Sequence, residues 1–294
     1  MDLRHHIEKL EVFVAVAKAG SFRAASERIH ISQPSISHAM QVLEKSVGSQ
    51  LFIRNQRGVE LTRAGSELLR FSERLMIEVE SVEKRIQQPD SELVGTLSLG
   101  TFSSLISYLW SPFLLHLSTG LGHQISVRLH SLKGEDVEGA LRSRRHHLIV
   151  SSVNVQMQDA INFELYSDSY GFFRSKKQKG AFSKAPLIYV PAATDVGGLA
   201  LEKILRQAEI QSEKTYHVDT FEAAASLANE GLGLAVLPIR VAAHLGLTQI
   251  SEEGAYAKTY GRHAIYGSML AIDRSDPLLM FITKELKIWT SKIR

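Results

Sequence analysis

The chain has 294 residues, no cysteine and a net charge of +3 at neutral pH. The absence of cysteine excludes disulfide bonds, thiolate metal sites and redox sensing through a thiol. A chain of this length has more residues than one hydrophobic core usually organises, so we predict two to three domains. No apolar run approaches the roughly 18 residues of a membrane span, and charged residues near the start exclude a signal peptide. We therefore expect a cytoplasmic protein that does not contact a membrane.

The excess positive charge lies entirely within the first 65 residues. They hold 9 Lys and Arg against 6 Asp and Glu, whereas residues 66–294 hold 25 of each kind. DNA-binding segments carry such an excess because they contact phosphates. The start of the chain is therefore the candidate nucleic-acid-binding segment.

The first 50 residues carry signals for three short helices. Ser21 and Ser32 are good N-cap residues for the second and third of them, and Pro34 falls in the first turn of the third, where a missing N–H costs nothing. Only His30 and Ile31 separate the second helix from the third. The predicted helices cover Leu10–Ala19, Phe22–Arg28 and a stretch that begins at Ser32.

The third helix has one apolar and one polar face. Its apolar residues recur at helical spacing and are Ile36, Met40, Leu43 and Val47. The other face holds only hydrogen-bonding groups and no acid. A helix, a short turn and a second helix with such a face form the helix-turn-helix pattern, in which the second helix reads base edges in the major groove.

Two short apolar runs, Leu51–Ile53 and Val59–Leu61, flank a basic tip and predict a small hairpin, or wing. The alternative is a small helical core with a polar exterior that does not bind DNA. The local excess of positive charge favours DNA binding over this alternative. We expect bases to face Gln33, Ser35, Ser37 and His38, and phosphates to lie nearer Arg54 and Arg57. The candidate DNA-binding residues are Ser21, Ser32, Gln33, Pro34, Ser35, Ser37, His38, Gln41, Arg54 and Arg57.

Residues 62–88 predict one long helix, since apolar residues fall three or four apart from Leu61 to Ile86, close to a heptad seam. Such a helix is roughly 40 Å long at 1.5 Å per residue. The alternative is that the helix packs against its own domain. A helix of this length, however, extends beyond the surface that one domain offers. We therefore expect a dimer-forming linker that places two recognition helices about 34 Å apart on an inverted-repeat operator.

After a polar hinge around Pro89, strand-like and helical stretches alternate. Strands are predicted at 93–100, 124–129 and 148–150, with helices at 101–117 and 134–144 between them. The pattern recurs with strands at 187–190, 215–218 and 231–238 and helices at 198–208 and 221–230. Alternation of this kind is typical of α/β organisation with parallel strands, here in two similar lobes.

The first 65 residues resemble LysR-type transcriptional regulators. The matching positions, in order and with the family's spacing, are Val12-Phe13, Gly20-Ser21-Phe22, Ala24-Ala25, Ser32 to Ser37, Leu43-Glu44, Gly48, Leu51-Phe52, Arg54 and Leu61 to Gly65. A weaker second match is the helix ending in Asn229-Glu230-Gly231 before a strand that stops at Pro238. Two departures stand out: His38 replaces a longer, usually Arg, side chain, and His146-His147 stands where Leu-Asp is common.

The resemblance implies a winged helix-turn-helix over residues 1–61, a linker helix over 62–88 and an effector domain resembling a periplasmic binding protein over 89–294. The last would have lobe I at about 91–161 and 268–294, and lobe II at about 162–267. The resemblance also implies a homodimer or homotetramer that binds double-stranded promoter DNA, responds to a small-molecule effector and contacts RNA polymerase. It implies no enzymatic activity and no cofactor.

In two-lobed α/β domains, ligands bind at the carboxyl ends of strands, where helix N-termini present free N–H groups. For any single hydroxyl at these places, capping a helix is the simpler role. Because several of them are expected at the same edge of the two lobes, we predict an effector cleft there. Neutral hydroxyls with one His and no Arg or Lys favour a small ligand, such as a carboxylate held by helix dipoles. The candidate effector-binding residues are Thr101, Ser103, Ser104, His130, Ser131, Ala192, Thr194, Thr220 and Phe221.

Three other functions are set aside. An enzyme is disfavoured because no nucleophile elbow or phosphate loop occurs, and Gly231-x-Gly233 meets Val236 where a dinucleotide fingerprint needs Gly or Ala. A metal site is disfavoured because the His5-His6 and His146-His147 pairs are adjacent, so their side chains point apart. A binding protein that serves a transporter has no use for residues 1–65.

Overall fold

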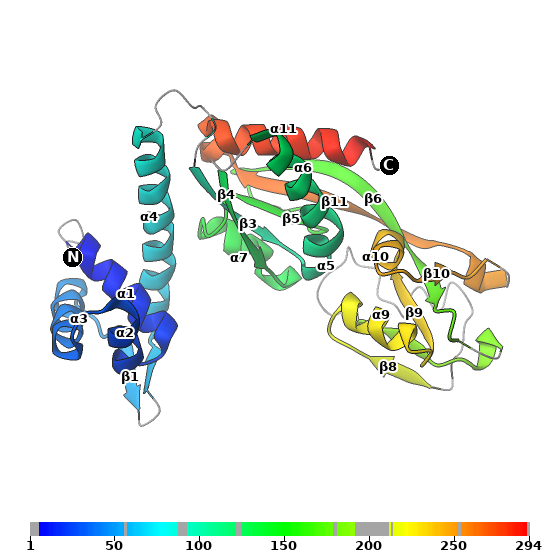
Figure 1. Cartoon of the computed structure of the whole chain (residues 1–294), viewed down its shortest axis with the longest axis horizontal. Coiled ribbons are helices and arrows are strands. Elements are labelled where there is room, and N and C mark those ends of the chain that lie inside the picture. The colour runs from blue at the N-terminus through cyan, green and yellow to red at the C-terminus, as the bar shows by residue number, and fades with distance from the viewer. Residues whose placement is uncertain are drawn as a thin grey trace. The chain divides into compact units, whose positions relative to one another are not determined.

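The computed structural model of the chain describes residues 6–55, 58–87, 93, 95–121, 125–178, 181–191, 212, 214–251 and 254–292. The chain forms two compact units (Figure 1), residues 1–89 with 143–145 and residues 90–142 with 146–294. Among the residues described, no helix combines the length and apolar character needed to cross a membrane.

The N-terminal unit is a winged helix-turn-helix followed by a long helix. Its core gathers Leu10 and Phe13 from the first helix, Ile36 and Met40 from the third and Phe52 from the hairpin, all buried. The apolar stripe predicted for the third helix therefore faces the core, except that Val47 is only partly buried. The elements are α1 (Ile7–Ala19), α2 (Phe22–Ile29), α3 (Gln33–Val47), β1 (Phe52–Asn55), β2 (Gly58–Leu61) and α4 (Arg63–Gln87).

Two side chains join the hairpin to its neighbouring helices. The Glu44 carboxylate, in the last turns of α3, accepts a hydrogen bond from the Leu51 N–H at 2.8 Å. The Thr62 hydroxyl donates to the Gln50 carbonyl at 2.7 Å and accepts from the Gly65 N–H at 2.9 Å, which caps α4. Strand β1 is thus fixed between the end of α3 and the start of α4.

Gly65 is required by this close approach. A Cβ on Gly65 would lie 2.1 Å from the Leu51 carbonyl oxygen. We expect Gly65→Ala to lower the free energy of unfolding of the N-terminal unit by roughly 1–3 kcal/mol, because backbone atoms have to shift. Both tryptophans, Trp110 and Trp289, belong to the C-terminal unit. The variant should therefore shift the urea transition seen by far-UV circular dichroism but leave the tryptophan fluorescence transition in place.

Gly139→Ala in the C-terminal unit is the matched control. No atom lies within 4 Å of a Cβ built on Gly139, and alanine is favoured over glycine in a helix by roughly 0.5–1 kcal/mol. We expect this variant to be neutral or slightly stabilising. Equal destabilisation by the two substitutions would contradict the steric explanation.

The C-terminal unit is built on one mixed sheet. Within the described residues it has nine strands in the order β4-β3-β5-β11-β6-β9-β7-β8, with β10 paired to β6. β3 pairs in parallel with β4 and β5, and β7 pairs in parallel with β8 and β9. The strands are β3 (Gly95–Thr101), β4 (Ile125–Ser131), β5 (Leu148–Ser151), β6 (Ala160–Arg174), β7 (Leu187–Tyr189), β8 (Thr215–His217), β9 (Leu234–Pro238), β10 (Thr248–Gln249) and β11 (Tyr260–Leu270).

Helices flank these strands. The single helix predicted for 101–117 is wrong in detail, because a π-helical segment divides it and it continues to Leu121. The helix predicted for 198–208 lies outside the described residues. The helices are α5 (Ser103–Leu105), the π-helix η1 (Ile106–Trp110), α6 (Ser111–Leu121), α7 (Val137–Arg142), α9 (Phe221–Asn229), α10 (Ile239–His244) and α11 (Pro277–Lys292).

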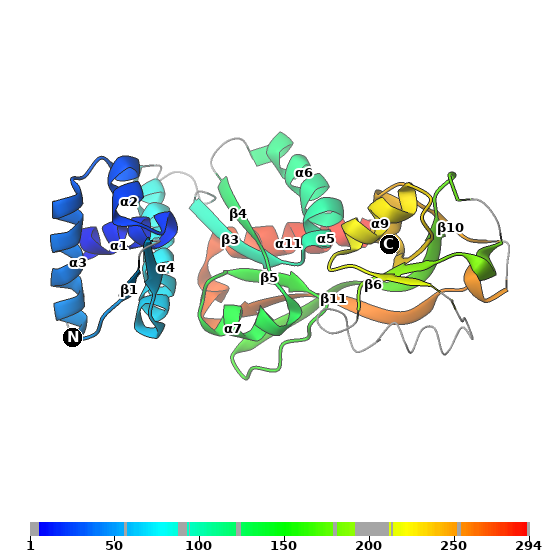
Figure 2. The same cartoon turned by 90° about the horizontal axis from the view of Figure 1, so that it is seen from below.

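Two long strands, β6 and β11, run through both lobes of this unit (Figures 1 and 2). They pair antiparallel from Tyr260 opposite Tyr170 to Leu270 opposite Ala160. Lobe I contains β3, β4 and β5 with α5, η1, α6, α7 and α11, and lobe II contains β7 to β10 with α9 and α10. The predicted two-lobed α/β domain is thereby confirmed.

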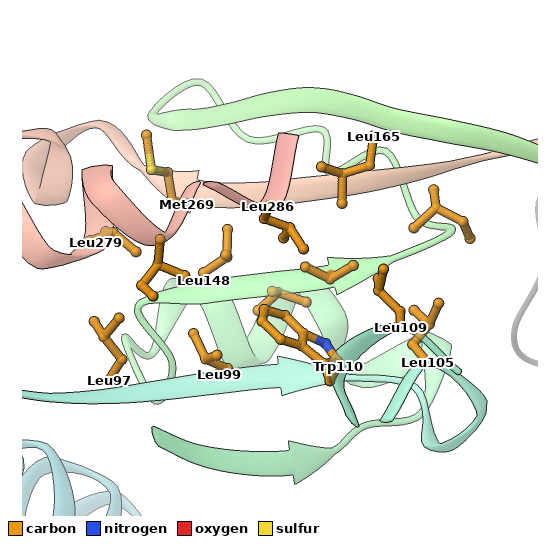
Figure 3. Close-up of a cluster of buried hydrophobic side chains, with 14 of the residues drawn as sticks. Leu97, Leu99, Leu105, Leu109, Trp110, Leu148, Leu165, Met269, Leu279 and Leu286 are labelled. Atoms are coloured by element: carbon orange, nitrogen blue, oxygen red, sulfur yellow. The ribbon is translucent and has the colours of Figure 1, made fainter. Parts of the chain in front are cut away.

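The larger core lies in lobe I (Figure 3). It buries Trp110 and Phe113 from the helical segment after β3, with their ring centroids 5.8 Å apart. Side chains from the sheet and from α11 complete it, among them Leu97, Leu99, Leu148, Met269, Leu279 and Leu286. Tyr166 of β6 belongs to the same core, so the crossing strand is anchored in lobe I before it enters lobe II.

The strand directions set where the two lobes can bind a ligand. β11 is antiparallel to both β5 and β6, and β9 is antiparallel to β6. The parallel strands of lobe I therefore point along β6 towards lobe II, and those of lobe II point back. The carboxyl ends of both sets face the middle of β6 and β11, around Tyr166 to Tyr170.

Candidate DNA-binding face and effector cleft

Serine hydroxyls fix the starts of α2 and α3. The Ser21 hydroxyl accepts from the Ala24 N–H at 3.1 Å, and the Ser32 hydroxyl accepts from the Ser35 N–H at 3.3 Å. The hydroxyls of Ser32 and Ser35 also share a hydrogen bond of 2.7 Å. Between the helices, His30 adopts a left-handed conformation with φ 57°. The predicted caps are therefore present, and they orient the first turn of α3.

The polar face of α3 is open at its N-terminal end. Gln33, Pro34, Ser35, His38 and Gln41 are exposed and Ser37 is half-buried. The first turn contains no acidic residue, and the positive end of the helix dipole lies there. This surface therefore offers hydrogen-bond donors and acceptors beside the positive end of a helix dipole, a combination that suits contact with a nucleic acid.

The wing adds a positioned cation. The Arg54 guanidinium lies over the Phe22 ring, with its carbon 4.7 Å from the ring centroid. Phe22 is buried and packs edge-on against Phe52 at 6.0 Å, so the stack joins the exposed Arg54 to the core of the unit. Arg57 lies outside the described residues.

On the lobe I side of the predicted cleft, Thr101, His130 and Ser131 belong to the ends of strands rather than to the segments that follow them, whereas Ser103 and Ser104 lie in α5 after β3. Thr101 ends β3 and pairs with Ser131 at the end of β4. The Thr101 hydroxyl is fully buried and donates to the Val150 carbonyl at 2.9 Å, so it is committed to the sheet. Ser131 is exposed, Ser103 is half-buried and Ser104 is buried.

His130 is exposed next to Ser131, and it lies close to a second histidine. The rings of His130 and His146 are 5.1 Å apart, and His146 Nδ1 is 3.0 Å from the Ser98 hydroxyl. His147 Nδ1 accepts from the Ser98 N–H at 2.9 Å. The adjacent pair that departs from the family pattern therefore packs on β3 through its contacts with Ser98.

On the lobe II side, Thr220 and Phe221 are at the start of α9. The Thr220 hydroxyl accepts from the Ala223 N–H at 3.1 Å, the capping role. The Phe221 ring lies edge-on to Tyr170 at 6.3 Å, which places it near the crossing strands. Ala192 and Thr194 lie outside the described residues. At neighbouring strand ends, the rings of Tyr189 and His217 are 4.4 Å apart.

A polar pair on the crossing strands was not predicted from the sequence. Asp168 of β6 pairs directly with His263 of β11, and both are buried. Within the described part of the chain, His263 Nδ1 is buried without a hydrogen-bond partner. Burial lowers the pKa of His263, and the Asp168 carboxylate opposes this shift. No sequence signal singled this pair out, because both strands carry several other polar residues, such as Glu164 and Ser167 in β6 and Arg262 in β11.

Two tyrosines and an arginine adjoin this pair. The hydroxyls of Tyr108 and Tyr166 are hydrogen-bonded, and burial raises the pKa of each, so both stay protonated. The Arg240 guanidinium carbon lies 4.7 Å from the Tyr166 ring centroid. These residues come from η1, β6 and α10, and so from both lobes.

Comparison with known proteins gives a consistent result along the chain. Residues 7–66 match the model of the bacterial regulatory helix-turn-helix protein, lysR family, and residues 90–251 match the LysR substrate binding domain. The regulator TcbR of Pseudomonas sp. strain P51 is 30% identical over 251 residues, which cover 80% of this chain and 83% of TcbR. ClcR of Pseudomonas putida is 27% identical over 249 residues, 80% of this chain and 83% of ClcR.

Solved structures agree with this assignment. The crystal structure of CbnR, a LysR family transcriptional regulator, has a TM-score of 0.70 at 22% identity and covers 96% of this chain and 98% of CbnR. The crystal structure of full-length CbnR complexed with the target DNA has a TM-score of 0.69 at 23% identity, and it covers 97% of this chain and 99% of CbnR. The relatives TcbR and ClcR are transcriptional regulators rather than enzymes. The chain therefore belongs to the LysR family: it is a DNA-binding transcriptional regulator with a C-terminal substrate-binding domain.

Proposed function

We propose that the chain acts as a homodimer or homotetramer that reads an inverted-repeat promoter site, and that a small-molecule effector in the cleft between lobes I and II modulates this binding or the activation that follows. The observation that carries the proposal is the exposed, acid-free polar face at the start of α3, next to a wing with an exposed arginine. A face of this kind suits base edges and phosphates together.

The roles on DNA follow from position on this face. Gln33, Ser35 and His38 are exposed, and with the half-buried Ser37 they face the bases. Arg54 and Arg57 contact phosphates beside the groove. Ser21, Ser32 and Pro34 orient the helix starts, and their N-terminal location also suits contact with phosphate. Gln41 is one turn further along the same face.

The linker helix supports pairing of two copies. Phe71, Val82 and Ile86 are exposed by 39%, 44% and 72%, and they lie on the seam with the half-buried Leu75 and Val79. Exposed apolar side chains at heptad spacing gain stability when a second copy covers them. Two joined DNA-binding units then reach successive major grooves of an inverted repeat.

The cleft supports binding of a small ligand. Ser131, His130 and Ser103 lie at the carboxyl edge of lobe I, and Thr220 and Phe221 lie at the facing edge of lobe II, with Ala192 and Thr194 assigned there from the sequence. Hydroxyls and a histidine near helix starts suit a carboxylate. Occupation of the cleft changes the angle between the lobes or between effector domains. The linker helices pass that change to the bound DNA and to RNA polymerase.

A thermal-shift screen of the full chain against organic acids, amino acids and aromatic compounds tests the effector proposal. A ligand at a hundred times its dissociation constant stabilises the folded state by about 2.7 kcal/mol. We expect at least one saturable hit whose effect Ser131→Trp removes, since the new ring fills the carboxyl edge of lobe I.

Ser118→Trp is the matched control, because Ser118 is exposed on α6 and α6 returns towards the amino ends of the strands. A hit that both variants remove, or that neither removes, would place the ligand outside the proposed cleft.

A further inference from the structure

Arg240 connects lobe II to a residue of the lobe I core. It belongs to the first turn of α10, which directly follows β9 of lobe II. Its guanidinium carbon lies 4.7 Å from the centroid of the Tyr166 ring, and Tyr166 is buried in the lobe I core. A cation over an aromatic face is attracted by the ring quadrupole, more strongly where water is excluded.

A hydrogen bond links Tyr166, the residue that Arg240 contacts, to a helical segment of lobe I. The Tyr166 hydroxyl is hydrogen-bonded to the hydroxyl of Tyr108 in η1, and η1 packs against α10. η1 is a π-helical segment between two α-helical ones, and π segments inside helices are frequent at functional sites. Lobe II is thus joined through Arg240 and Tyr166 to the first helical segment of lobe I.

The start of α10 is also fixed to the crossing strand. The Arg240 N–H donates to Asp168 Oδ2 at 3.2 Å, while Asp168 Oδ1 accepts from the Ser169 N–H at 2.8 Å. Asp168 lies two residues beyond Tyr166, so both side chains are on the same face of β6. Backbone and side chain of Arg240 therefore bind one short stretch of β6, opposite the buried His263.

Both contacts lie on the strands that join the two lobes. β6 and β11 carry the chain between the lobes, and their register shifts between Ile265 and Tyr266 and again between Tyr260 and Arg262. Such irregularities re-aim and bend a strand pair. Arg240 therefore contacts β6 in the segment between these two irregularities.

We propose that Arg240 is an interlobe latch, which holds the effector domain in one lobe orientation through its stack on Tyr166 and its backbone bond to Asp168. The inference deepens the proposed function and rests on it in one respect, namely that the effector cleft lies between these lobes. A ligand that changes the lobe angle has to alter this contact.

The test is a distance measurement between the lobes in the full chain without added ligand. Because the chain has no cysteine, Thr119→Cys on α6 and Ser226→Cys on α9 give two exposed labelling sites. Spin labels on both report the interlobe distance by double electron–electron resonance. Exchange with a large excess of unlabelled protein leaves one labelled copy per oligomer. We expect one narrow distance peak for the doubly labelled chain that retains Arg240.

Arg240→Gln should shift this peak or make it at least twice as wide, with the melting profile still showing a folded protein. Arg240→Lys retains a cation that the Tyr166 ring attracts and should recover the original peak at least in part. Tyr108→Phe, which removes the hydroxyl bond on the lobe I side, should widen the peak less than Arg240→Gln.

Lys177→Gln is the control, since it removes another cation of lobe II, which is exposed and pairs with Glu230 of the same lobe at 2.8 Å. An unchanged peak in folded Arg240→Gln, an equal change in Lys177→Gln, or no recovery with lysine would overturn the latch. Since no ligand is used, failure here is distinct from failure of the thermal-shift screen.

Discussion

Val82→Glu in the linker helix should convert the protein to a monomer and weaken binding to an operator by about 100-fold or more. Val82 is exposed on the seam of α4, so pairing would bury the new carboxylate of both copies in an apolar interface. A monomer holds DNA with one recognition helix only and loses the high effective concentration that links the two half-sites. Sedimentation equilibrium measures the mass, and fluorescence anisotropy measures operator binding.

Glu83→Gln, at the neighbouring exposed position, is the control and should retain the mass and affinity of the wild type. If Val82→Glu stays dimeric, the seam of α4 is not the pairing surface. If it becomes monomeric but binds the operator as well as the wild type, two joined recognition helices are not what DNA binding requires.

Gln33→Ala and Arg54→Ala should affect DNA binding in two different ways. A glutamine in the groove discriminates one base pair by roughly 1–3 kcal/mol through paired hydrogen bonds. Gln33→Ala should therefore abolish preference at one position of each half-site, while affinity for unrelated DNA is preserved. Arg54→Ala should weaken binding to all sequences and lower the slope of affinity against salt by about 1 per half-site.

These outcomes are separated by measuring the affinity for every single-base variant of one operator at several salt concentrations. Gln50→Ala provides a control glutamine, exposed just before the wing, and should change neither preference nor salt dependence. The reverse pattern, with Arg54 setting sequence preference and Gln33 setting only overall affinity, would refute the proposed roles.

The N-terminal unit was predictable from sequence because its signals are local. A capping serine, a proline in the first turn and an apolar stripe at helical spacing all act within about four turns of one helix. They located α3, and they also identified Ser21 and Ser32 as the caps that the structure shows. Heptad spacing from residue 62 onward likewise indicated the long helix observed as Arg63–Gln87.

The cleft was harder to predict because it depends on distant pairing. The commitment of the Thr101 hydroxyl to Val150 follows from strand register between residues 49 apart. Tyr108 and Tyr166 are 58 residues apart, and Asp168 and Arg240 are 72 apart. No periodicity or motif links these residues along the chain. The pattern located the parallel strands, but it predicted neither of the crossing strands β6 and β11. It therefore could not identify the side chains that meet between the lobes.

We propose above all that the chain reads an inverted repeat as a homo-oligomer. Selection of bound sequences from random double-stranded DNA with the purified full-length protein tests it most directly. We predict enrichment of an inverted repeat whose half-site centres are one helical turn, about 10 base pairs, or a small multiple of it apart. Enrichment of a single unpaired half-site, or of no sequence, would contradict the account.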